Sequence, residues 1–558
     1  MVDITTILLI KEDALNKTAI DEHYLVKLEK EGIPRECVKI LPLLYNTHKK
    51  VLAKTGKAYL DKLHTKIPDT VNNLLIVDSN YFKFITKTTK VSNSYGATVQ
   101  GAYDNFEKYT CVYLPSYKTL FKQPENTQLI DLGIRAIAGT GASVEIHSSE
   151  FGFEYGTDRG ILDSLYKHPV LAADIETTGL ELDSKIVSIA FAWTKHDGVA
   201  IDLDINGLFY LKEFLQNYKG KLIFHGGLFD AKLLIRSLWM KHATDYAGMM
   251  EGLNYFRTFD DTMLMAYLAK NATTQVALGL KECALEYVGN YAIEIEDITK
   301  HTKKEILEYN LIDVLGTVYL YEKYHVELTS RPYLEIFQPS LYPLLKMMLV
   351  GLPMDPDRVA EVHKILAAKE RALEQQIQLN THVIAFNIQL KIDTCEKANA
   401  KLVKLVKTVD DFKDVEFNPN SGPQLIKLLF DMLGLPILEK TKSGAAGTGA
   451  DVLEDLKNHT QDQDILDLLD FVIELADNSK INGTFIKAFM KEVYFLHGNL
   501  KLGGTQSGRL SSNSPNLTNL PAQGPMGKLV KSCIVAPGPK YLVDKDKWAD
   551  IMASATNL

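Results

Sequence analysis

The chain has 558 residues, of which 46% are hydrophobic and 24% are charged, and its formal net charge is −8. This length allows several domains, and this composition excludes a disordered, a collagenous or a membrane-spanning chain. Five dispersed cysteines without a C-x-x-C pair argue against a zinc site or a disulfide framework. The first residues lack the features of a signal peptide. We therefore expect a cytoplasmic protein.

The first 165 residues alternate short apolar runs with a helical pattern. The runs Ile7–Ile10, Leu74–Val77 and Cys111–Leu114 predict strands, and Asn126–Ala138 predicts a helix. Such an alternation predicts an N-terminal α/β domain. These residues contain no set of side chains that indicates catalysis, so packing or the docking of a partner is the expected role of the domain.

An acidic pattern follows in the middle of the chain. An apolar run that predicts a buried strand contains Asp174 and, two residues later, Glu176, and strand alternation places both carboxylates on one face. Tyr309 and Asp313 are one turn apart in a predicted helix, so they also share a face. Between these pairs, Asp230 closes a second apolar run. We therefore expect the four carboxylates and the tyrosine to meet in one site.

Four carboxylates that converge in a core repel one another unless cations lie between them. Hard oxygen ligands are those that Mg²⁺ and Mn²⁺ prefer. Two such ions, ~4 Å apart, can bind the attacking and the leaving oxygen of a phosphodiester displacement. The pattern therefore predicts a site for two Mg²⁺ or Mn²⁺ ions, and the predicted metal ligands are Asp174, Glu176, Asp230 and Asp313.

The order of these residues resembles the DEDDy family of 3′→5′ exonucleases, whose first motif is matched by Asp174 and Glu176, the second by Asp230, and the third by Tyr309 and Asp313. The resemblance implies that Asp174, Glu176 and Asp313 hold the metal that carries the nucleophilic water, and that Asp174 and Asp230 hold the second metal. It also implies that Tyr309 orients this water, because a hydroxyl both donates and accepts hydrogen bonds.

The surrounding segments extend the resemblance. Phe259–Leu268 is similar to the family segment between the second and third motifs, and Leu180 matches the apolar residue that stacks against the terminal base. Gly226 is a departure, because the family often has an asparagine there that supports the strand-to-helix turn and the substrate strand. The resemblance implies a ribonuclease-H-like exonuclease domain over residues 166–330, with a mixed sheet and flanking helices.

The remaining residues, 331–558, begin with a predicted helical part. The apolar spacing of Tyr333–Leu349 and of Val359–Leu379 is close to the helical period. Further on, the segment 480–543 contains eight Lys or Arg residues and one acid, Glu492. A basic stretch in an acidic chain indicates contact with a nucleic-acid backbone.

Within this basic stretch, Lys501–Pro521 resembles the T-G-R-L-S-S…P-N-L-Q-N-I-P signature of family A DNA polymerases. Upstream of the stretch, Phe417–Leu425 and Lys440–Glu454 are similar to segments of that family's thumb. The resemblance implies a helical thumb and part of a palm that bind primer-template DNA. Glycines let a backbone approach DNA closely, and hydroxyl and amide side chains supply phosphate and sugar contacts. The predicted DNA-binding residues of this stretch are Thr505, Arg509, Ser511, Ser512, Asn516 and Asn519.

Near the end of the sequence, Tyr541–Asp546 resembles the start of palm motif A, and Asp546 aligns with the metal-binding acid of that motif. The family's motifs B and C have no counterpart in the residues that follow. We therefore expect an incomplete palm, which polymerises DNA only when a second polypeptide carrying motifs B and C completes it, because both palm carboxylates are needed to hold the metals.

The two resemblances together are most similar to family A polymerases of bacteriophage type with a proofreading domain. They predict the N-terminal portion of a replicative DNA polymerase, with metal-dependent exonuclease activity on single-stranded 3′ ends, in the cytoplasm of the host cell. Two alternatives stay open. A free-standing exoribonuclease of the ribonuclease D type leaves the signature around Arg509 unexplained, and a non-catalytic DNA-binding subunit leaves the complete carboxylate set unexplained.

Overall fold

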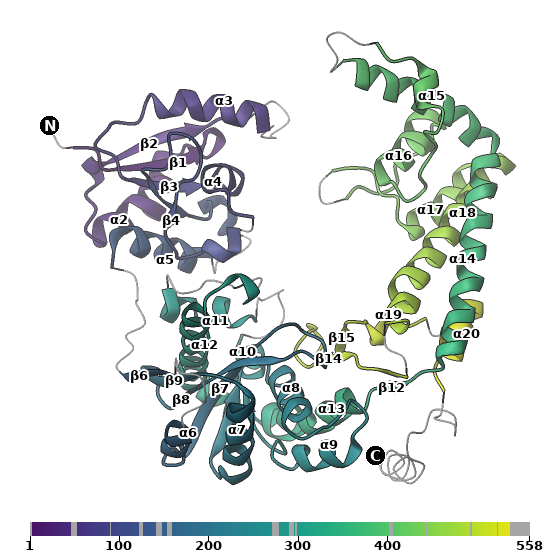
Figure 1. The fold of residues 1–558 in the computed structure, drawn as a ribbon. Coiled ribbons are helices and arrows are strands. Elements are labelled where there is room, and N and C mark those ends of the chain that lie inside the picture. Colours follow the sequence, from purple (N-terminus) through teal and green to yellow (C-terminus); the bar gives the residue numbers. More distant parts are fainter. Residues whose placement is uncertain are drawn as a thin grey trace. The chain divides into compact units, whose positions relative to one another are not determined.

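The computed structural model describes residues 3–45, 53–89, 91–121, 126–140, 148–152, 159–270, 278–289, 295, 298–400, 406–441, 444–491, 494–521 and 523–535. The chain divides into two compact units, Met1–Leu349 with Lys501–Leu510 and Val350–Leu500 with Ser511–Leu558. Several sheets occur together with many helices, so the predicted multidomain α/β class is confirmed (Figure 1). No helix among the described residues is long and apolar enough to cross a membrane.

The first unit begins with a five-stranded sheet in the order β2-β1-β3-β5-β4, in which β4 is antiparallel and the other strands are parallel. Ile7 and Leu9 of β1 pack in a cluster with α3 and α4, whereas Leu8 and Ile10 pack in a cluster with α2 and α5, so the strand is buried on both faces. The predicted α/β layering of this region is therefore confirmed. Its elements are β1 (Thr6–Lys11), α1 (Lys17–Ile20), α2 (Val26–Lys30), β2 (Val38–Leu43), α3 (Ala53–His64), β3 (Asn73–Val77), α4 (Ser79–Thr86), β4 (Val99–Gln100), β5 (Thr110–Tyr113) and α5 (Asn126–Ala138).

The second sheet of this unit has six strands in the order β11-β10-β7-β8-β9-β6 and is mixed. β8 is antiparallel to β7 and β9, whereas β10 is parallel to β7 and β11, and β6 is parallel to β9. β6 precedes residue 166, so the sheet includes a strand upstream of the predicted start of the exonuclease domain. The strands are β6 (Ser148–Gly152), β7 (Val170–Thr177), β8 (Ile186–Ala192), β9 (Asp197–Asp202), β10 (Lys221–Phe224) and β11 (Asp260–Asp261).

A long helix, α12, packs across this sheet and carries two of the predicted site residues. Its Leu311 and Leu315 share a core with Ala172 of β7 and with alanines of β8 and β9, whose small side chains let the helix approach the sheet closely. On the opposite face, the rings of Phe191 in β8 and Phe214 in α7 lie 5.4 Å apart. The helices of this part are α6 (Arg159–Leu165), α7 (Ile205–Asn217), α8 (Leu228–Leu238), α9 (Tyr246–Leu253), α10 (Thr262–Ala269), α11 (Leu280–Val288), α12 (Lys303–Lys323) and α13 (Gln338–Val350).

The second unit is mostly helical, as the sequence predicts. Val359, Val362 and Leu366 recur at helical spacing on α14 and pack in one core with Ile481 and Phe485. The unit begins at Val350, so α13 belongs almost wholly to the first unit. Its helices and strands are β12 (Leu352–Pro353), α14 (Pro356–Leu379), α15 (Thr381–Asn399), α16 (Gly422–Ile426), α17 (Ala450–Leu456), α18 (Gln463–Lys480), α19 (Lys487–Phe489), β13 (Phe495–Leu496), β14 (Asn499–Lys501), β15 (Ser511–Asn513) and α20 (Gly524–Ser532).

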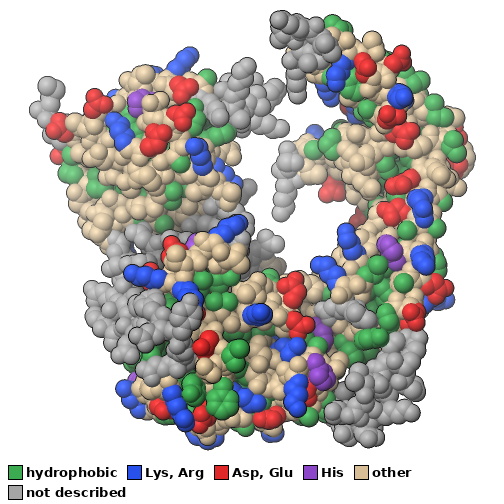
Figure 2. All heavy atoms as spheres, viewed as in Figure 1, with side chains coloured by type: hydrophobic (Ala, Val, Ile, Leu, Met, Phe, Trp, Pro, Cys, Tyr) green, Lys and Arg blue, Asp and Glu red, His purple; other side chains and the backbone are tan. Residues whose placement is uncertain are grey.

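The visible surface of the described residues mixes charges of both signs. On the face in Figure 2, lysine and arginine side chains are interspersed with acidic ones. The net charge of −8 is therefore not gathered in one acidic area of this face. Such a surface would attract a polyanion through local clusters of basic residues rather than through the charge of the whole chain.

Candidate active site

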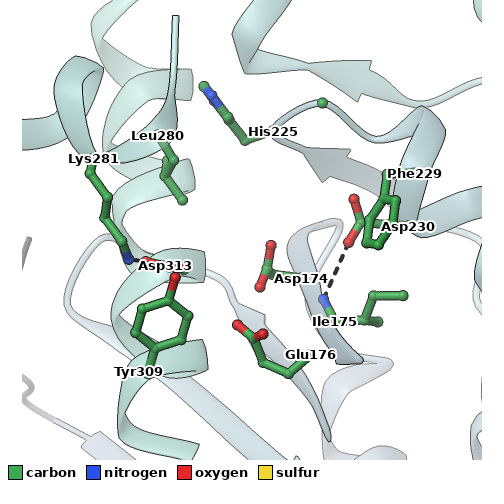
Figure 3. Close-up of a pocket in the computed structure, with 11 residues that line it drawn as sticks. Asp174, Ile175, Glu176, His225, Phe229, Asp230, Leu280, Lys281, Tyr309 and Asp313 are labelled. Carbon is green, nitrogen blue, oxygen red and sulfur yellow. Dashed lines mark hydrogen bonds and ion pairs between the residues drawn. The ribbon is translucent and has the colours of Figure 1, made fainter. Parts of the chain in front are cut away.

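The centre of the candidate site is β7, where Asp174 and Glu176 point into one pocket, as strand alternation predicts (Figure 3). Asn310 of α12 is fully buried behind them, and its Nδ2 donates a hydrogen bond of 2.7 Å to Asp174 Oδ2. The Oδ1 atom of Asn310 in turn accepts a hydrogen bond of 3.1 Å from Ser188 Oγ on β8. A chain of hydrogen bonds between sheet and helix therefore fixes the orientation of the Asp174 carboxylate, and the sequence-based prediction did not include Asn310.

Asp230 enters the pocket from the first turn of α8. Its side chain is buried, and its Oδ1 accepts a hydrogen bond of 3.2 Å from the backbone N–H of Ile175. Burial, followed by the nearby charge of Asp174, raises the pKa of Asp230 well above its ordinary value. A bound cation favours the ionised form of such a carboxylate, so this pair of acids is suited to a metal site.

The turn before α8 has Gly226 at the position where the resemblance leads us to expect an asparagine. Gly226 has φ of +77°, in the left-handed region that glycine adopts without strain. The Asp261 carboxylate accepts hydrogen bonds of 3.0 Å from the N–H groups of both Gly226 and Gly227, and one of 2.9 Å from Met263 at the start of α10. The neighbouring strand β11 therefore holds the turn, and Asp261 takes a role that the sequence alone did not indicate.

Tyr309 and Asp313 line the pocket from one face of α12, as their spacing predicts. Asp313 is 7% exposed and forms an ion pair with Lys281 of α11. The Nζ atom of Lys281 also lies 4.2 Å from the centroid of the Tyr309 ring. Lys281 is a further pocket residue that the sequence-based prediction did not include. The signal that could have indicated it is a lysine next to Leu280 in the first turn of a mostly apolar helix.

The acidic side chains have the arrangement that a hard cation needs. Carboxylate oxygens of Asp174, Glu176 and Asp313 lie within 4.8 Å of one another, and all three are donors that Mg²⁺ or Mn²⁺ prefers. Asp230 is not part of this group, but it lines the same pocket of about 240 Å³. The residues therefore fit one cation held by three carboxylates, and a second ion between Asp174 and Asp230 stays a prediction.

His225 precedes the turn and has a structural environment. Its ring nitrogens lie 2.9 Å from Thr262 Oγ1 and 2.8 Å from the carbonyl oxygen of Leu278. Burial lowers the pKa of His225 to about 4, so the ring is neutral at pH 7. Both nitrogens are occupied, so His225 is not placed as a metal ligand.

Three of the predicted DNA-binding residues are described in the first unit. Leu180 lies in the turn after β7 and is 69% exposed. Arg509 is exposed, and its carbonyl oxygen accepts a hydrogen bond of 2.9 Å from Thr505 Oγ1. The Thr505 carbonyl accepts another of 2.9 Å from Tyr267 Oη of α10. The side chains of Leu180 and Arg509 are accessible, whereas the Thr505 hydroxyl helps to close its own loop.

The other predicted DNA contacts lie in β15 and in the turn that follows it. Ser512 is 6% exposed, and its Oγ accepts a hydrogen bond of 2.9 Å from the Thr518 N–H. Asn516 Oδ1 accepts a hydrogen bond of 2.8 Å from Thr518 Oγ1. Ser511 is partly buried and Asn519 is exposed. Ser512 and Asn516 therefore hold the turn together, and contact of any of these side chains with DNA stays a prediction.

Comparison with known proteins gives two family matches. Residues 159–329 match the family described as 3′-5′ exonuclease, and residues 390–548 match DNA polymerase family A. The DNA polymerase I of Bacillus subtilis (strain 168) is 24% identical over 449 residues, which are 76% of this chain and 42% of that protein. The DNA polymerase of Escherichia phage T5 is 25% identical over 579 residues, which are 95% of this chain and 60% of that protein. The chain thus spans less than two thirds of the length of these curated relatives.

One solved structure is also similar, the POL domain of Pol1 from M. smegmatis in complex with DNA primer-template and dNTP. It has a TM-score of 0.47 and 18% sequence identity, and the alignment covers 70% of this chain and 59% of that one. Asp546 falls inside the family A match but lies outside the described residues, so its part in a palm stays a prediction. The chain is therefore similar to family A DNA polymerases that carry a 3′-5′ exonuclease domain.

Proposed function

We propose that this homologue of family A DNA polymerases hydrolyses single-stranded DNA from the 3′ end, as the DEDDy-type proofreading part of a replicative polymerase of bacteriophage type. The observation that carries the proposal is the convergence of Asp174, Glu176 and Asp313 within 4.8 Å, with Asp230 and Tyr309 in the same pocket. Packing alone does not account for this cluster, because like charges so close together destabilise a fold unless a cation joins them.

The reaction is the attack of water on the phosphorus of the last phosphodiester. A bond from the water oxygen to phosphorus forms, the bond from phosphorus to the 3′ oxygen of the preceding nucleotide breaks, and a 5′-nucleotide is released. Mg²⁺ or Mn²⁺ held by the carboxylates supplies Lewis-acid polarisation of the water and the phosphate. The Tyr309 hydroxyl orients the water, Glu176 accepts its proton, and the leaving 3′ oxygen takes a proton from solvent. The exposed Leu180 stacks against the terminal base.

The family A match of residues 390–548 supports a second part of the proposal, the binding of primer-template DNA. Arg509, exposed in a basic stretch, is the best placed cation of the signature for a phosphate contact. A cytoplasmic protein of an infected host cell fits this role. A free-standing exoribonuclease is not favoured, because it would leave the match to DNA polymerase family A unexplained. A purely DNA-binding subunit is not favoured, because it would leave the carboxylate cluster unexplained.

The test is a nuclease assay with a 5′-labelled single-stranded oligonucleotide. With Mg²⁺ or Mn²⁺ the chain should shorten the DNA from its 3′ end, and EDTA should stop the reaction. Asp174→Ala with Glu176→Ala should abolish activity, because most of the cation's ligands are lost. Tyr309→Phe should slow turnover and leave metal binding intact. An unchanged rate in the double variant, or a preference for RNA of the same sequence, contradicts the proposal.

A further inference from the structure

A buried lysine faces the acidic pocket and has no role in the reaction described so far. Lys281 lies in the first turn of α11 and is 7% exposed. It lines the pocket together with the four carboxylates and Tyr309 (Figure 3). Among the described lining residues, the other basic side chain is His225, which is neutral at pH 7. Lys281 is therefore the positive charge that this part of the chain brings to the pocket.

Packing does not require a charge at this position. Burying an ammonium group costs free energy, which here is offset by the ion pair with Asp313 and by the face of the Tyr309 ring. The contact between α11 and α12 already has an apolar core, in which Ala284 and Val288 share a cluster with Leu311. An apolar side chain would hold the two helices together at least as well as a buried ion pair. The retained charge therefore indicates a role in the pocket.

The negative charge of the substrate phosphate gives Lys281 such a role. Two divalent cations would balance the four carboxylates, but the substrate phosphodiester brings a further negative charge, which increases as water attacks. A cation bound by Asp313 competes with Lys281 for the same carboxylate. The ammonium group, at 4.2 Å from the centroid of the Tyr309 ring, then faces the side of the pocket from which the water attacks.

We propose that Lys281 binds the scissile phosphate: its ammonium group leaves Asp313 when metal and DNA enter the pocket and donates a hydrogen bond to a non-bridging oxygen of the last phosphodiester. This role rests on the proposed exonuclease function and adds a residue that contacts the substrate. It assigns two successive partners to one cation, first a protein carboxylate and then the substrate. A lysine that only screens Asp313 would keep one partner throughout.

The first test compares substrates in the presence of Ca²⁺, so that binding is measured without cleavage. One oligonucleotide ends in a normal phosphodiester, and the other has an uncharged methylphosphonate at the last linkage. The intact chain should bind the charged linkage about 10-fold more tightly, as expected for one charge-assisted hydrogen bond, and Lys281→Met should bind both almost equally. Lys281→Arg should retain part of the preference. Lys303→Met removes an exposed lysine of α12 that pairs with Asp202, and it should behave like the unaltered chain.

The second test separates phosphate binding from metal binding. In Lys281→Met, the cleavage rate at saturating Mn²⁺ should fall about 10²-fold, the size expected for a lost contact to transition-state charge. The affinity for Mn²⁺ without DNA, measured by electron paramagnetic resonance, should stay the same or increase, because a competing cation has been removed. The first test compares the affinities of one variant for the charged and the uncharged linkage. A lower stability of Lys281→Met reduces both affinities alike, so their ratio can still be interpreted.

An unchanged preference for the charged linkage in Lys281→Met overturns the proposal. So does a full cleavage rate at saturating Mn²⁺ together with a shifted Mn²⁺ affinity, because that pattern belongs to a lysine that only screens Asp313. If the unaltered chain does not cleave DNA at all, the exonuclease proposal fails, and the binding ratio still reports separately on the contact between Lys281 and phosphate.

Discussion

Each large sheet of the first unit has a buried or partly buried aspartate in or directly after one of its strands, but the two aspartates meet different surroundings. In the N-terminal sheet, Asp78 follows β3 and is 4% exposed. Its Oδ2 lies 3.1 Å from Nζ of Lys11, and its Oδ1 accepts a hydrogen bond of 2.8 Å from the N–H of Tyr81, in the first turn of α4. One lysine and one helix N-terminus therefore satisfy this carboxylate.

In the six-stranded sheet, Asp174 lies within β7 and meets other acids. Glu176 and Asp313 reach within 4.8 Å of it, and its neighbour Asp230 has a raised pKa. Among the described residues that line this pocket, the one lysine is Lys281, which pairs with Asp313. The comparison teaches that an aspartate in a sheet is a stabilising group when local partners satisfy it, and a candidate metal ligand when several elements bring unmatched carboxylates together.

The largest effect that tests this comparison is on catalysis. Asp174→Ala should lower the 3′→5′ exonuclease rate by at least about 10³-fold, because one carboxylate that contacts the cation is lost. Asp78→Ala should leave the rate per folded molecule unchanged and lower stability by about 1–2 kcal/mol, because α4 loses its N-cap. Rates are measured by single-turnover cleavage, and stability is measured by thermal unfolding.

Equal losses of rate in the two variants would contradict the division between a stabilising and a metal-binding aspartate. Asp78→Asn is the matched control for the first sheet, because an asparagine can still cap α4 and only the charge next to Lys11 is removed. It should recover most of the stability that Asp78→Ala loses.

A smaller effect is expected from the residue that orients Asp174. Asn310→Ala removes the 2.7 Å hydrogen bond to Asp174 and should weaken Mn²⁺ binding or slow cleavage by about 10–100-fold, as is typical for groups that orient metal ligands. Asn478→Ala is the matched control, because Asn478 is an equally buried helical asparagine whose Nδ2 bonds the carbonyl of Leu366 in the second unit. It should affect stability without changing Mn²⁺ affinity. A shift of Mn²⁺ affinity in Asn478→Ala would mean that loss of packing, not of orientation, explains both variants.

These residues also show what the sequence can and cannot predict. The pairing of Asp174 with Glu176 and of Tyr309 with Asp313 is local, because strand and helix periods decide which side chains share a face. Asn310 donates a hydrogen bond to Asp174, which lies 136 positions away in the chain. No local sequence pattern links the two residues, so the sequence does not predict this contact. Lys281 and Asp261 were missed for the same reason, since their partners are brought to them only by the packing of α11 on α12 and of β11 beside β10.

The fold shows the same limit. Apolar runs predicted the bounds of the strands β1, β3 and β5 to within about one residue, and a helical pattern predicted those of α5. The assignment of β6 to the second sheet depends on its pairing with β9, which no short apolar run indicates. The predicted DNA-binding residues of the signature are a further case, because Ser512 bonds to the turn around Thr518. A motif can require a serine for the shape of a turn as much as for contact with a ligand.

A next smaller effect concerns pH and His225. Its folded pKa of about 4 lies below the ordinary value of 6.5 because burial disfavours the charged ring. Between these two values the unfolded chain binds more protons, so the contribution of His225 to stability is present above pH 6.5 and is lost as the pH falls towards 4. The loss is at most about 3 kcal/mol. Tryptophan fluorescence is a suitable probe of unfolding, because Trp193 and Trp239 both lie in the same segment, 159–329, as His225.

The measurement compares urea unfolding of the intact chain and of His225→Gln at pH 7.5 and pH 5. The intact chain should lose more stability between the two pH values than the variant does. An equal loss in both would show that other groups carry the acid sensitivity of this part of the chain.

The smallest effect expected here is at the polymerase signature. Arg509→Ala should weaken binding of primer-template DNA a few-fold, equally for unrelated sequences, and should reduce the slope of log affinity against log salt by about one unit, because one phosphate contact is lost. Arg371→Ala, which removes an exposed arginine of α14 bonded to the carbonyl of Ala367, is the matched control and should leave the slope unchanged. Binding is measured by fluorescence anisotropy at several salt concentrations. A loss confined to one DNA sequence would indicate a base contact instead. If the slope did not change, Arg509 would not be a phosphate contact, and its carbonyl bond to Thr505 would be the part of Arg509 that matters, as the bond to Thr518 is for Ser512.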